Sequence, residues 1–250
     1  MMKQLLNKTI AIALCVTASA ATAQKLPTKQ TVSLQAVDTK IDGKTNEKFQ
    51  AYNTSIEAFY TISNDDENLY LTVKAVQHDI ASKIIRGGLS LIINHTIKKN
   101  DPEQVTITYP ILRNAEMAAV ANMYARKPFD QGDGSTTSVK QLNDMLQAKS
   151  KTIGLSGIKA IPDKEISVYN EDGIKAVSLF DDKNAYTYEL AIPLKYLNLP
   201  NAGADAFSYH IKVNEVYMGA QTGGGPPAPP VPISALGTTD FWGEYTLAKK

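Results

Sequence analysis

Apolar and polar residues alternate along much of this 250-residue chain, and this two-residue period constrains its fold more than any other feature. In LYLTVKA (69–75) every second residue is apolar, which is the pattern of a β-strand with one face in a protein core. IEAFYTI (56–62) shows the same period. The polar run SNDDEN (63–68) between them is rich in turn-forming residues, so the two segments predict an antiparallel hairpin.

Short apolar segments separated by turn-forming residues continue to the C-terminus. We expect further strands at Gly88–Asn94, Gln104–Pro110, Ile158–Ile161, Ile166–Tyr169, Ile174–Phe180, Ala185–Ile192, Phe207–Tyr217 and Phe241–Leu247. We also expect a short helical turn at Leu194–Leu197, opened by Pro193. Many short strands with few intervening helices predict an all-β fold, an antiparallel β-sandwich.

One segment departs from the two-residue period. Arg113–Ala125 is rich in helix-forming residues, and Ser138–Ala148 spaces its apolar residues as a helix does. We therefore expect a partly helical insertion at about residues 112–150. It either caps an open end of the sandwich or forms a lid over a ligand.

The N-terminus has the three parts of a secretory signal peptide: basic Lys3 and Lys8, the apolar stretch Thr9–Ala18, and the small residues Ala21-Thr22-Ala23 before a cleavage site. We expect residues 1–23 to be removed in preference to lipidation of Cys15. Residues 24–250 then form a single exported domain, in the periplasm or at the cell surface. No later segment reaches the roughly 20 apolar residues of a transmembrane helix.

Composition excludes several classes of function. Cys15 is the only cysteine, so cleavage leaves a chain that can form neither disulfides nor a catalytic thiolate. The chain carries 26 basic and 25 acidic residues. This balance gives no indication of a nucleic-acid or anionic-membrane surface, and we expect no nucleic-acid partner.

Short motifs follow one another in a recognisable order. They are Asp42-Gly43, Ile62–Asp65 with Asn68–Leu71, Gly88–Asn94, Tyr188–Leu194 and Trp242–Leu247. This series resembles the carbohydrate-binding module family 9-like (CBM9-like) sandwich domains of exported bacterial proteins, which are akin to DOMON domains. The resemblance implies a β-sandwich and, where relatives bind sugar, aromatic side chains that stack on pyranose rings. A shared fold does not by itself confer that function.

The candidate ligand-binding residues are polar or aromatic and lie near predicted loops. They are Asn214, Glu215, Tyr217, Tyr52 and Tyr124. Trp242 is the only tryptophan, and its place in the last strand motif predicts a structural role, so the paired tryptophans of sugar-binding relatives cannot form here. Tyrosines could replace them, although such tyrosines commonly pack a sandwich edge instead. The loop Gly219–Pro232 is either a flexible connection or a rim that contacts a ligand or partner.

No catalytic or metal-binding motif is present. His78, His95 and His210 are not spaced as metal ligands. The acidic run Asn64–Asn68 lacks the spacing of a helix-loop-helix calcium site, so we interpret it as a solvated turn. We expect no cofactor, with calcium alone left open, and no catalytic residue. If the chain is an enzyme, its machinery would be converging carboxylates drawn from predicted strands: Glu57, Glu189, Glu215 and Glu244.

We therefore expect an exported, non-catalytic binding protein that recognises a glycan through a face or a loop end of the β-sandwich. The alternative is a protein-interaction or assembly component of the cell envelope with no sugar ligand, using Gly219–Pro232 or Leu112–Ser150 as its contact surface. The identity of such a protein partner is not indicated by the sequence. A glycan-active enzyme is the third reading.

Overall fold

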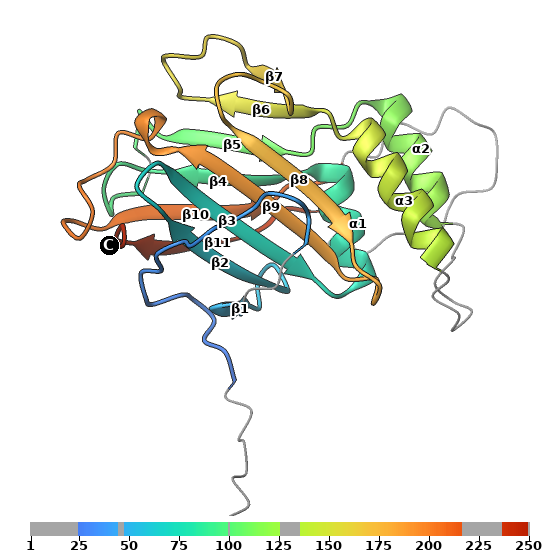
Figure 1. Cartoon of the computed structure of the whole chain (residues 1–250), viewed down its shortest axis with the longest axis horizontal. Coiled ribbons are helices and arrows are strands. Elements are labelled where there is room, and N and C mark those ends of the chain that lie inside the picture. The colour runs from blue at the N-terminus through green and yellow to red at the C-terminus, as the bar shows by residue number, and fades with distance from the viewer. Residues whose placement is uncertain (1–24, 45–47, 100, 126–135, 217–236, 250) are drawn as a thin grey trace, which may run out of the picture.

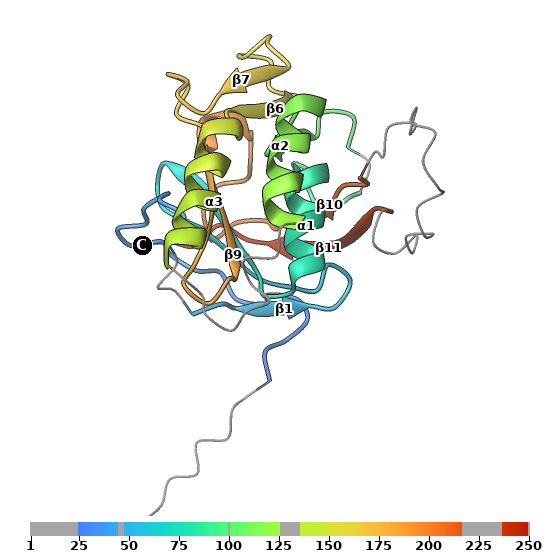
Figure 2. The same ribbon diagram turned by 90° about the vertical axis from the view of Figure 1, so that its right-hand side faces the viewer.

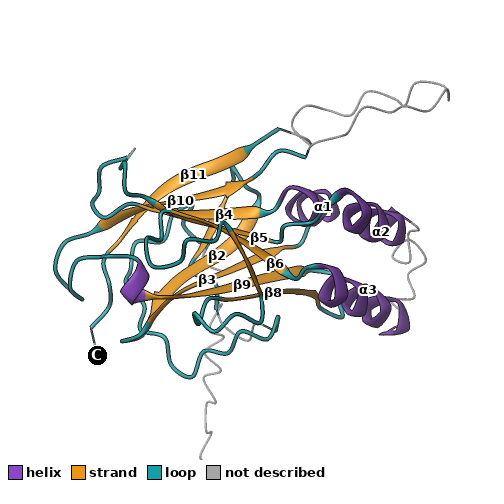
Figure 3. Ribbon diagram, turned by 90° about the horizontal axis from the view of Figure 1, so that it is seen from above, coloured by secondary structure: helices purple, strands orange, loops and turns teal. Residues whose placement is uncertain are grey.

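The predicted β-sandwich is confirmed: two antiparallel sheets pack face to face (Figures 1 and 3). The computed structural model describes residues 25–44, 48–99, 101–125, 136–216 and 237–249. The strands are β1 (Ala51–Asn53), β2 (Ala58–Asn64), β3 (Asn68–Ala75), β4 (Leu89–Ile93), β5 (Val105–Tyr109), β6 (Thr152–Ser156), β7 (Glu165–Ser167), β8 (Lys175–Phe180), β9 (Tyr186–Pro193), β10 (Phe207–Val213) and β11 (Thr239–Tyr245). The expected turn after Pro193 is a 3₁₀ helix, Leu194–Tyr196.

Sheet A has the strand order β1-β2-β3-β9-β8, and sheet B has the order β11-β10-β4-β5-β6-β7. The alternation in sequence fixes which side chains face inward. Leu71 of β3 lies opposite Leu190 of β9, and both are buried between the sheets. In sheet B, Ile211 of β10 lies between Leu91 and Phe241 in the same buried layer. Every second residue is left on an outer face.

The predicted hairpin forms between β2 and β3, and Asp65 organises its turn. One carboxylate oxygen of Asp65 accepts hydrogen bonds from the amides of Glu67 and Asn68 at 2.8 and 2.7 Å, and the other accepts the Tyr70 hydroxyl at 2.5 Å. Burial opposes ionisation of Asp65, but these hydrogen bonds outweigh it and lower the pKa of the carboxyl below its ordinary value. The acidic run is thus a turn that satisfies its own backbone.

Three helices lie together at one end of the sandwich: α1 (His78–Gly87), α2 (Asn114–Ala125) and α3 (Thr136–Lys149) (Figure 2). α2 and α3 belong to the predicted insertion, which joins β5 to its neighbour β6. Leu142 and Leu146 of α3 are fully buried, and the Asn143 amide exchanges hydrogen bonds with the backbone of Phe180 at the end of β8. The insertion therefore covers this end of the core.

Two local predictions are wrong, and one helix was not predicted. Ile158–Ile161 is not a strand, because Ile161 donates its amide to the Ile158 carbonyl and the resulting turn carries both side chains to the core. The strand of this region is β6, just upstream. Helix α1 was not expected; it ends where Gly88 adopts φ 76°. β10 ends at Val213, short of the expected Tyr217.

The segment 30–36 closes the sandwich along one side. It continues sheet A beside the part of β2 that β1 leaves unpaired, with Gln35 bridged to Asn64. Gln30 exchanges hydrogen bonds of 2.7 and 2.8 Å with the backbone of Ile62. On the other side, the amide of Leu34 donates to the Tyr245 hydroxyl, at 3.0 Å, so this segment connects sheet A to β11 of sheet B.

A buried carboxylate on the outer face of sheet A anchors the Asp42-Gly43 turn. Glu189 of β9 is 4% exposed, and one of its oxygens accepts the amides of Asp42 and Gly43 at 2.9 and 2.8 Å. Gly43 adopts φ 77°, and a Cβ there would meet Leu179 at 2.6 Å, so the position requires glycine. The Asp-Gly motif is thus part of the scaffold.

The expected signal peptide, residues 1–23, and the loop Gly219–Pro232 lie outside the described residues. Among the helices that are described, none combines the length and the apolar character needed to span a bilayer.

We predict that Glu189→Ala lowers the free energy of unfolding by about 2–3 kcal/mol, because it leaves two amides without their charged acceptor. Glu189→Gln should cost about 1 kcal/mol, since its amide oxygen can still accept both bonds. Urea denaturation monitored by circular dichroism measures the difference. The exposed Glu171→Ala is the matched control and should change stability by less than about 0.5 kcal/mol. Equal losses for all three variants would show that the anchor contributes nothing.

Candidate functional site

A groove of about 510 Å³ lies where the 30–36 segment, β11 and the loop after β4 meet. We call it the Trp242 groove. Its lining combines one tryptophan, several polar groups and two exposed apolar side chains. The lining residues are Lys29, Gln30, Thr31, Val32, Ser33, Ile97, Lys99, Ala206, Ser208, Trp242, Gly243, Glu244, Tyr245 and Thr246. Its volume falls in the range of pockets that hold small ligands, roughly 300–1,000 Å³.

Trp242 stands half-buried on the outer face of sheet B and stacks on His210 of the neighbouring strand. The two residues are cross-strand partners in register, and their rings lie 4.2 Å apart at an interplanar angle of 11°. The ammonium group of Lys99 also lies over the indole, 5.3 Å from its centroid, at a distance typical of a cation–π contact. The indole is therefore covered by an imidazole from the side of β10, and the ammonium group of Lys99 is its second neighbour.

His210 is kept neutral by its surroundings. Burial lowers the pKa of the imidazole below its ordinary value of 6.5, Asp240 opposes this shift, and Lys212 and Lys99 add to it. The Nε2 atom of His210 lies 3.4 Å from an Asp240 oxygen, and the imidazole side chain is 12% exposed. His210 is therefore mostly covered and supports the tryptophan.

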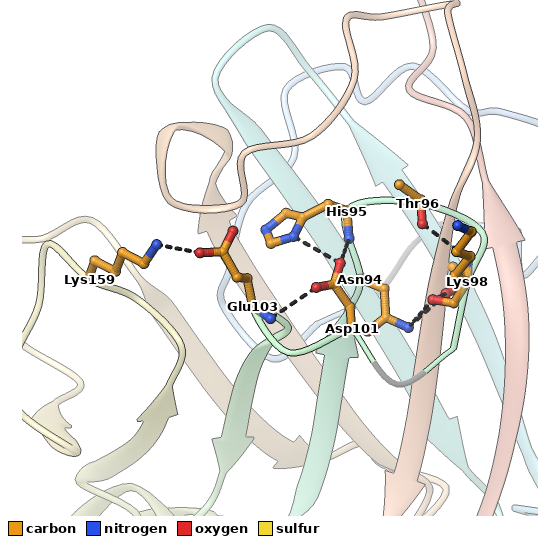
Figure 4. A network of polar contacts seen from close by, with 8 residues as sticks. Asn94, His95, Thr96, Lys98, Asp101, Glu103 and Lys159 are labelled. Atoms are coloured by element: carbon orange, nitrogen blue, oxygen red, sulfur yellow. Dashed lines mark hydrogen bonds and ion pairs between the residues drawn. The ribbon is translucent and has the colours of Figure 1, made fainter.

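A network of hydrogen bonds fixes the loop that contributes Ile97 and Lys99 (Figure 4). Asp101 accepts the amides of His95 and Glu103 at 3.1 and 2.9 Å, and an oxygen of Asp101 lies 3.0 Å from Nδ1 of His95. Hydrogen bonds from the Glu103 and His95 amides lower the pKa of Asp101 below its ordinary value, so it stays ionised at neutral pH.

The same loop is bonded to the sheet beneath it. The side-chain amide of Asn94 donates to the Ser208 hydroxyl and to the Lys98 carbonyl at 2.9 and 3.0 Å. The backbone amide of Ser208 donates to the Thr96 carbonyl at 2.9 Å. Figure 4 shows the Asn94 side chain bonded to Lys98 across this loop. These bonds hold the groove wall to the sheet, and a wall held in this way reduces the entropy that binding must overcome.

The rim of the groove is both apolar and charged. Val32 is 53% and Ile97 55% exposed, whereas apolar side chains of this size are usually buried. Two ammonium groups, from Lys29 and Lys99, and one carboxylate, from Glu244, share the lining. A surface of this kind can stack against a flat ligand and form hydrogen bonds around its edge.

The structure does not gather the predicted ligand-binding residues in one place. Asn214 lies just after β10, where its side chain bonds the Ser90 hydroxyl at 3.0 Å, and the exposed Glu215 follows it. Tyr52 lies on β1 of sheet A, 4.8 Å from the ring of Phe59. Tyr217 and the side chain of Tyr124 lie outside what the structure describes. None of the described candidates lines the Trp242 groove.

Two of the candidate catalytic carboxylates cannot act together. Glu189 lies on the outer face of sheet A and anchors the Asp42-Gly43 turn, whereas Glu244 lies on the outer face of sheet B. Two packed sheets about 10 Å apart separate them. Among the residues that the structure describes, no cluster of three or more His, Cys, Asp or Glu could hold a metal ion.

A larger hollow of about 800 Å³ lies on the outer face of sheet A. Its lining includes seven charged residues: Lys40, Asp66, Glu67, Glu171, Asp172, Lys175 and Lys195. Its one aromatic side chain, Tyr70, donates its hydroxyl to Asp65 at 2.5 Å. Because it lacks a tryptophan and an exposed apolar rim, this hollow is the weaker candidate for a binding site.

The sequence reasoning missed Trp242 as a site residue. The register of β10 and β11 places Trp242 beside His210 on the outer face, with the buried Phe241 and Gly243 on the inner one. The alternation in FWGEY (241–245) carried this signal, because a tryptophan out of phase with Phe241 and Tyr245 must face away from the core.

We predict that the fluorescence of Trp242 titrates with His210 at a pKa below 6.5, because protonation places a cation against the indole. Since Trp242 is the only tryptophan, its emission reports on the groove alone. The His210→Asn variant should remove the titration. A transition that persists in that variant would assign it to another group.

The same shift predicts a loss of stability in acid. The pKa of His210 is lower in the folded than in the unfolded chain, so the unfolded chain takes up the proton first as the pH falls. The contribution of neutral His210 is therefore present above about pH 6.5 and declines below it. Urea denaturation at pH 7.5 and 5.0 should show a smaller decline for His210→Asn than for the original chain.

No protein-family model and no curated protein matches this chain. The likeness to CBM9-like domains therefore remains a resemblance carried by the motifs described above. The sandwich itself is shown by the strands and their register, and the function has to be inferred from the groove.

Proposed function

We propose that this protein is a non-catalytic binding protein that recognises a saccharide in the Trp242 groove. One observation carries the proposal: the single tryptophan stands half-buried in a groove whose lining offers both hydrogen-bonding and apolar groups. Pyranose rings present apolar C–H faces and hydroxyl edges. An aromatic ring beside polar side chains is suited to both.

The rigidity of the site supports this proposal. His210 restrains one face of the indole, and hydrogen bonds hold the loop that contributes Ile97 and Lys99. A prearranged surface binds with less loss of conformational entropy than a mobile one. The predicted signal peptide suggests that binding takes place after export, in the periplasm or at the cell surface.

A second candidate function is attachment to a protein partner, as an assembly component of the cell envelope. The exposed side chains of Val32 and Ile97 favour it, since exposed apolar groups around a polar groove are also common at protein interfaces. β11 supports it as well, because it lies at the edge of sheet B and could pair with an extended chain. The saccharide is preferred because the groove is lined by the only tryptophan of the chain, a side chain suited to stacking on a sugar ring.

We predict that Trp242→Ala reduces saccharide affinity at least about tenfold, because it removes the stacking surface. A glycan array identifies the ligand, and isothermal titration calorimetry with the purified chain measures the affinity. Trp242→Phe should retain part of the binding, since it keeps an aromatic ring.

Tyr169→Ala is the matched control, because Tyr169 is 73% exposed and does not line the groove. Its affinity should equal that of the original chain. Thermal melts confirm that each variant is folded. Loss of binding in Tyr52→Ala or Asn214→Ala, with Trp242→Ala unaffected, would move the site to the residues first expected. The second candidate would be favoured if no glycan on the array binds and the chain instead recovers an envelope protein in stoichiometric amount. That recovery should depend on Val32 and Ile97.

A further inference from the structure

We infer that the saccharide bound in the Trp242 groove is anionic, carrying a carboxylate or sulfate group that the ammonium groups of Lys29 and Lys99 bind. This inference rests on the proposed function and specifies the chemical class of its ligand. It is carried by the placement of charges in the groove and by the position of Lys99 over the indole.

The two lysines of the groove have no acidic partner in the described part of the chain, a condition that they share with other exposed lysines such as Lys183. Lys74, Arg113, Lys140 and Lys159 each form an ion pair, with Asp181, Glu165, Asp144 and Glu103 respectively. Lys29 and Lys99 form none within the described part of the chain, although Glu244 lines the same groove. Two ammonium groups against one carboxylate give the groove a positive excess on a chain that is nearly neutral as a whole.

The position of Lys99 distinguishes a charged from an uncharged ligand. His210 covers one face of the indole, and Lys99 lies over the ring as well. A neutral sugar that stacks on Trp242 must displace the ammonium group and forfeit the cation–π contact. An anionic sugar offers the displaced ammonium a charge-assisted hydrogen bond instead, which is the stronger interaction.

The surroundings of the indole are positive on the side of β10 as well. Lys212 and Lys99 both disfavour the protonated form of His210, and Asp240 only partly compensates. The imidazole therefore stays neutral, and the cations that a ligand meets in the groove are Lys29 and Lys99. An anion entering the groove is attracted by the lysines and meets one opposing carboxylate, that of Glu244.

The test uses pairs of polysaccharides that differ in charge. Polygalacturonate is compared with its carboxyl-reduced form, and dextran sulfate with dextran, by calorimetry and Trp242 fluorescence in 0.05 M and 0.5 M NaCl. We expect at least one anionic member to bind at least tenfold more tightly than its neutral counterpart. Salt should weaken that binding, because the Debye length falls below about 10 Å above 0.1 M. Whether the carboxylate or the sulfate polymer binds distinguishes the two anionic groups.

Variants assign the effect to the groove. Lys29→Gln combined with Lys99→Gln should abolish the preference for the anionic member, Trp242→Ala should abolish binding, and Glu244→Gln should strengthen binding of the anion. Lys183→Gln, an exposed lysine outside the groove, makes the same charge change and should have no effect. Anion binding that survives Trp242→Ala, or that Lys183→Gln weakens equally, would be adsorption to surface lysines and would overturn the inference.

The remaining outcomes separate this inference from the proposed function. Binding of neutral and anionic members with equal affinity, independent of salt and of both lysines, would overturn the anionic class and leave a saccharide site at Trp242. Absence of binding by every polysaccharide tested here and by every glycan on the array would overturn both.

Discussion

The closure of the two sheets by the 30–36 segment is the constraint on which the rest of the structure depends. The side chain of Gln30 bonds the backbone of β2, and its backbone amide donates to the Tyr60 hydroxyl at 2.8 Å. That hydroxyl lies 3.0 Å from the hydroxyl of Tyr209 on sheet B. Farther along, the Tyr245 hydroxyl donates to Asn64 at 3.0 Å. These contacts are buried, so each hydrogen bond prevents an otherwise costly unpaired polar group.

The groove is a product of this closure. Gln30 lines the groove with its neighbours 29 and 31–33 and also fastens them to sheet A, while Tyr245 reaches the same groove from sheet B. A third part of the wall comes from the loop after β4, whose Asp101 satisfies two of its backbone amides, and Ala206 and Ser208 supply a fourth. A groove assembled from four parts of the chain is thus held in place by the bonds that close the sandwich.

Much of the fold could be predicted because every second side chain of a strand faces the core, which gives the strands a two-residue apolar period in the sequence. The hairpin of β2 and β3 and the insertion carrying α2 and α3 follow from the spacing of apolar residues. Helix α1 was missed because HDIASKIIRG is short and polar at its start. The segment 158–161 was wrongly assigned to a strand, since two isoleucines three residues apart suit a turn as well as a strand. Local spacing does not separate these cases.

The site was harder to predict, because it depends on which strands become neighbours. That Trp242 meets His210, 32 positions earlier in the sequence, follows from the pairing of β10 with β11. The tyrosines and Asn214 were chosen for their nearness to loops. In the structure Asn214 bonds Ser90 and Tyr52 packs on Phe59. Whether a polar side chain bonds within the fold or faces a ligand depends on its tertiary partners, which the alternation of residue types does not reveal.

The meeting of the two ends of the described chain has a consequence for how the protein matures. Ser33 bonds the carbonyl of Thr246, 213 positions away, and Leu34 bonds the hydroxyl of Tyr245, 211 positions away. Contacts of such long range form slowly, because a large loop must close before they are gained. The strand that carries Trp242, β11, is also the last of the described strands in chain order. The groove therefore forms only after both of these distant segments have been synthesised and have met.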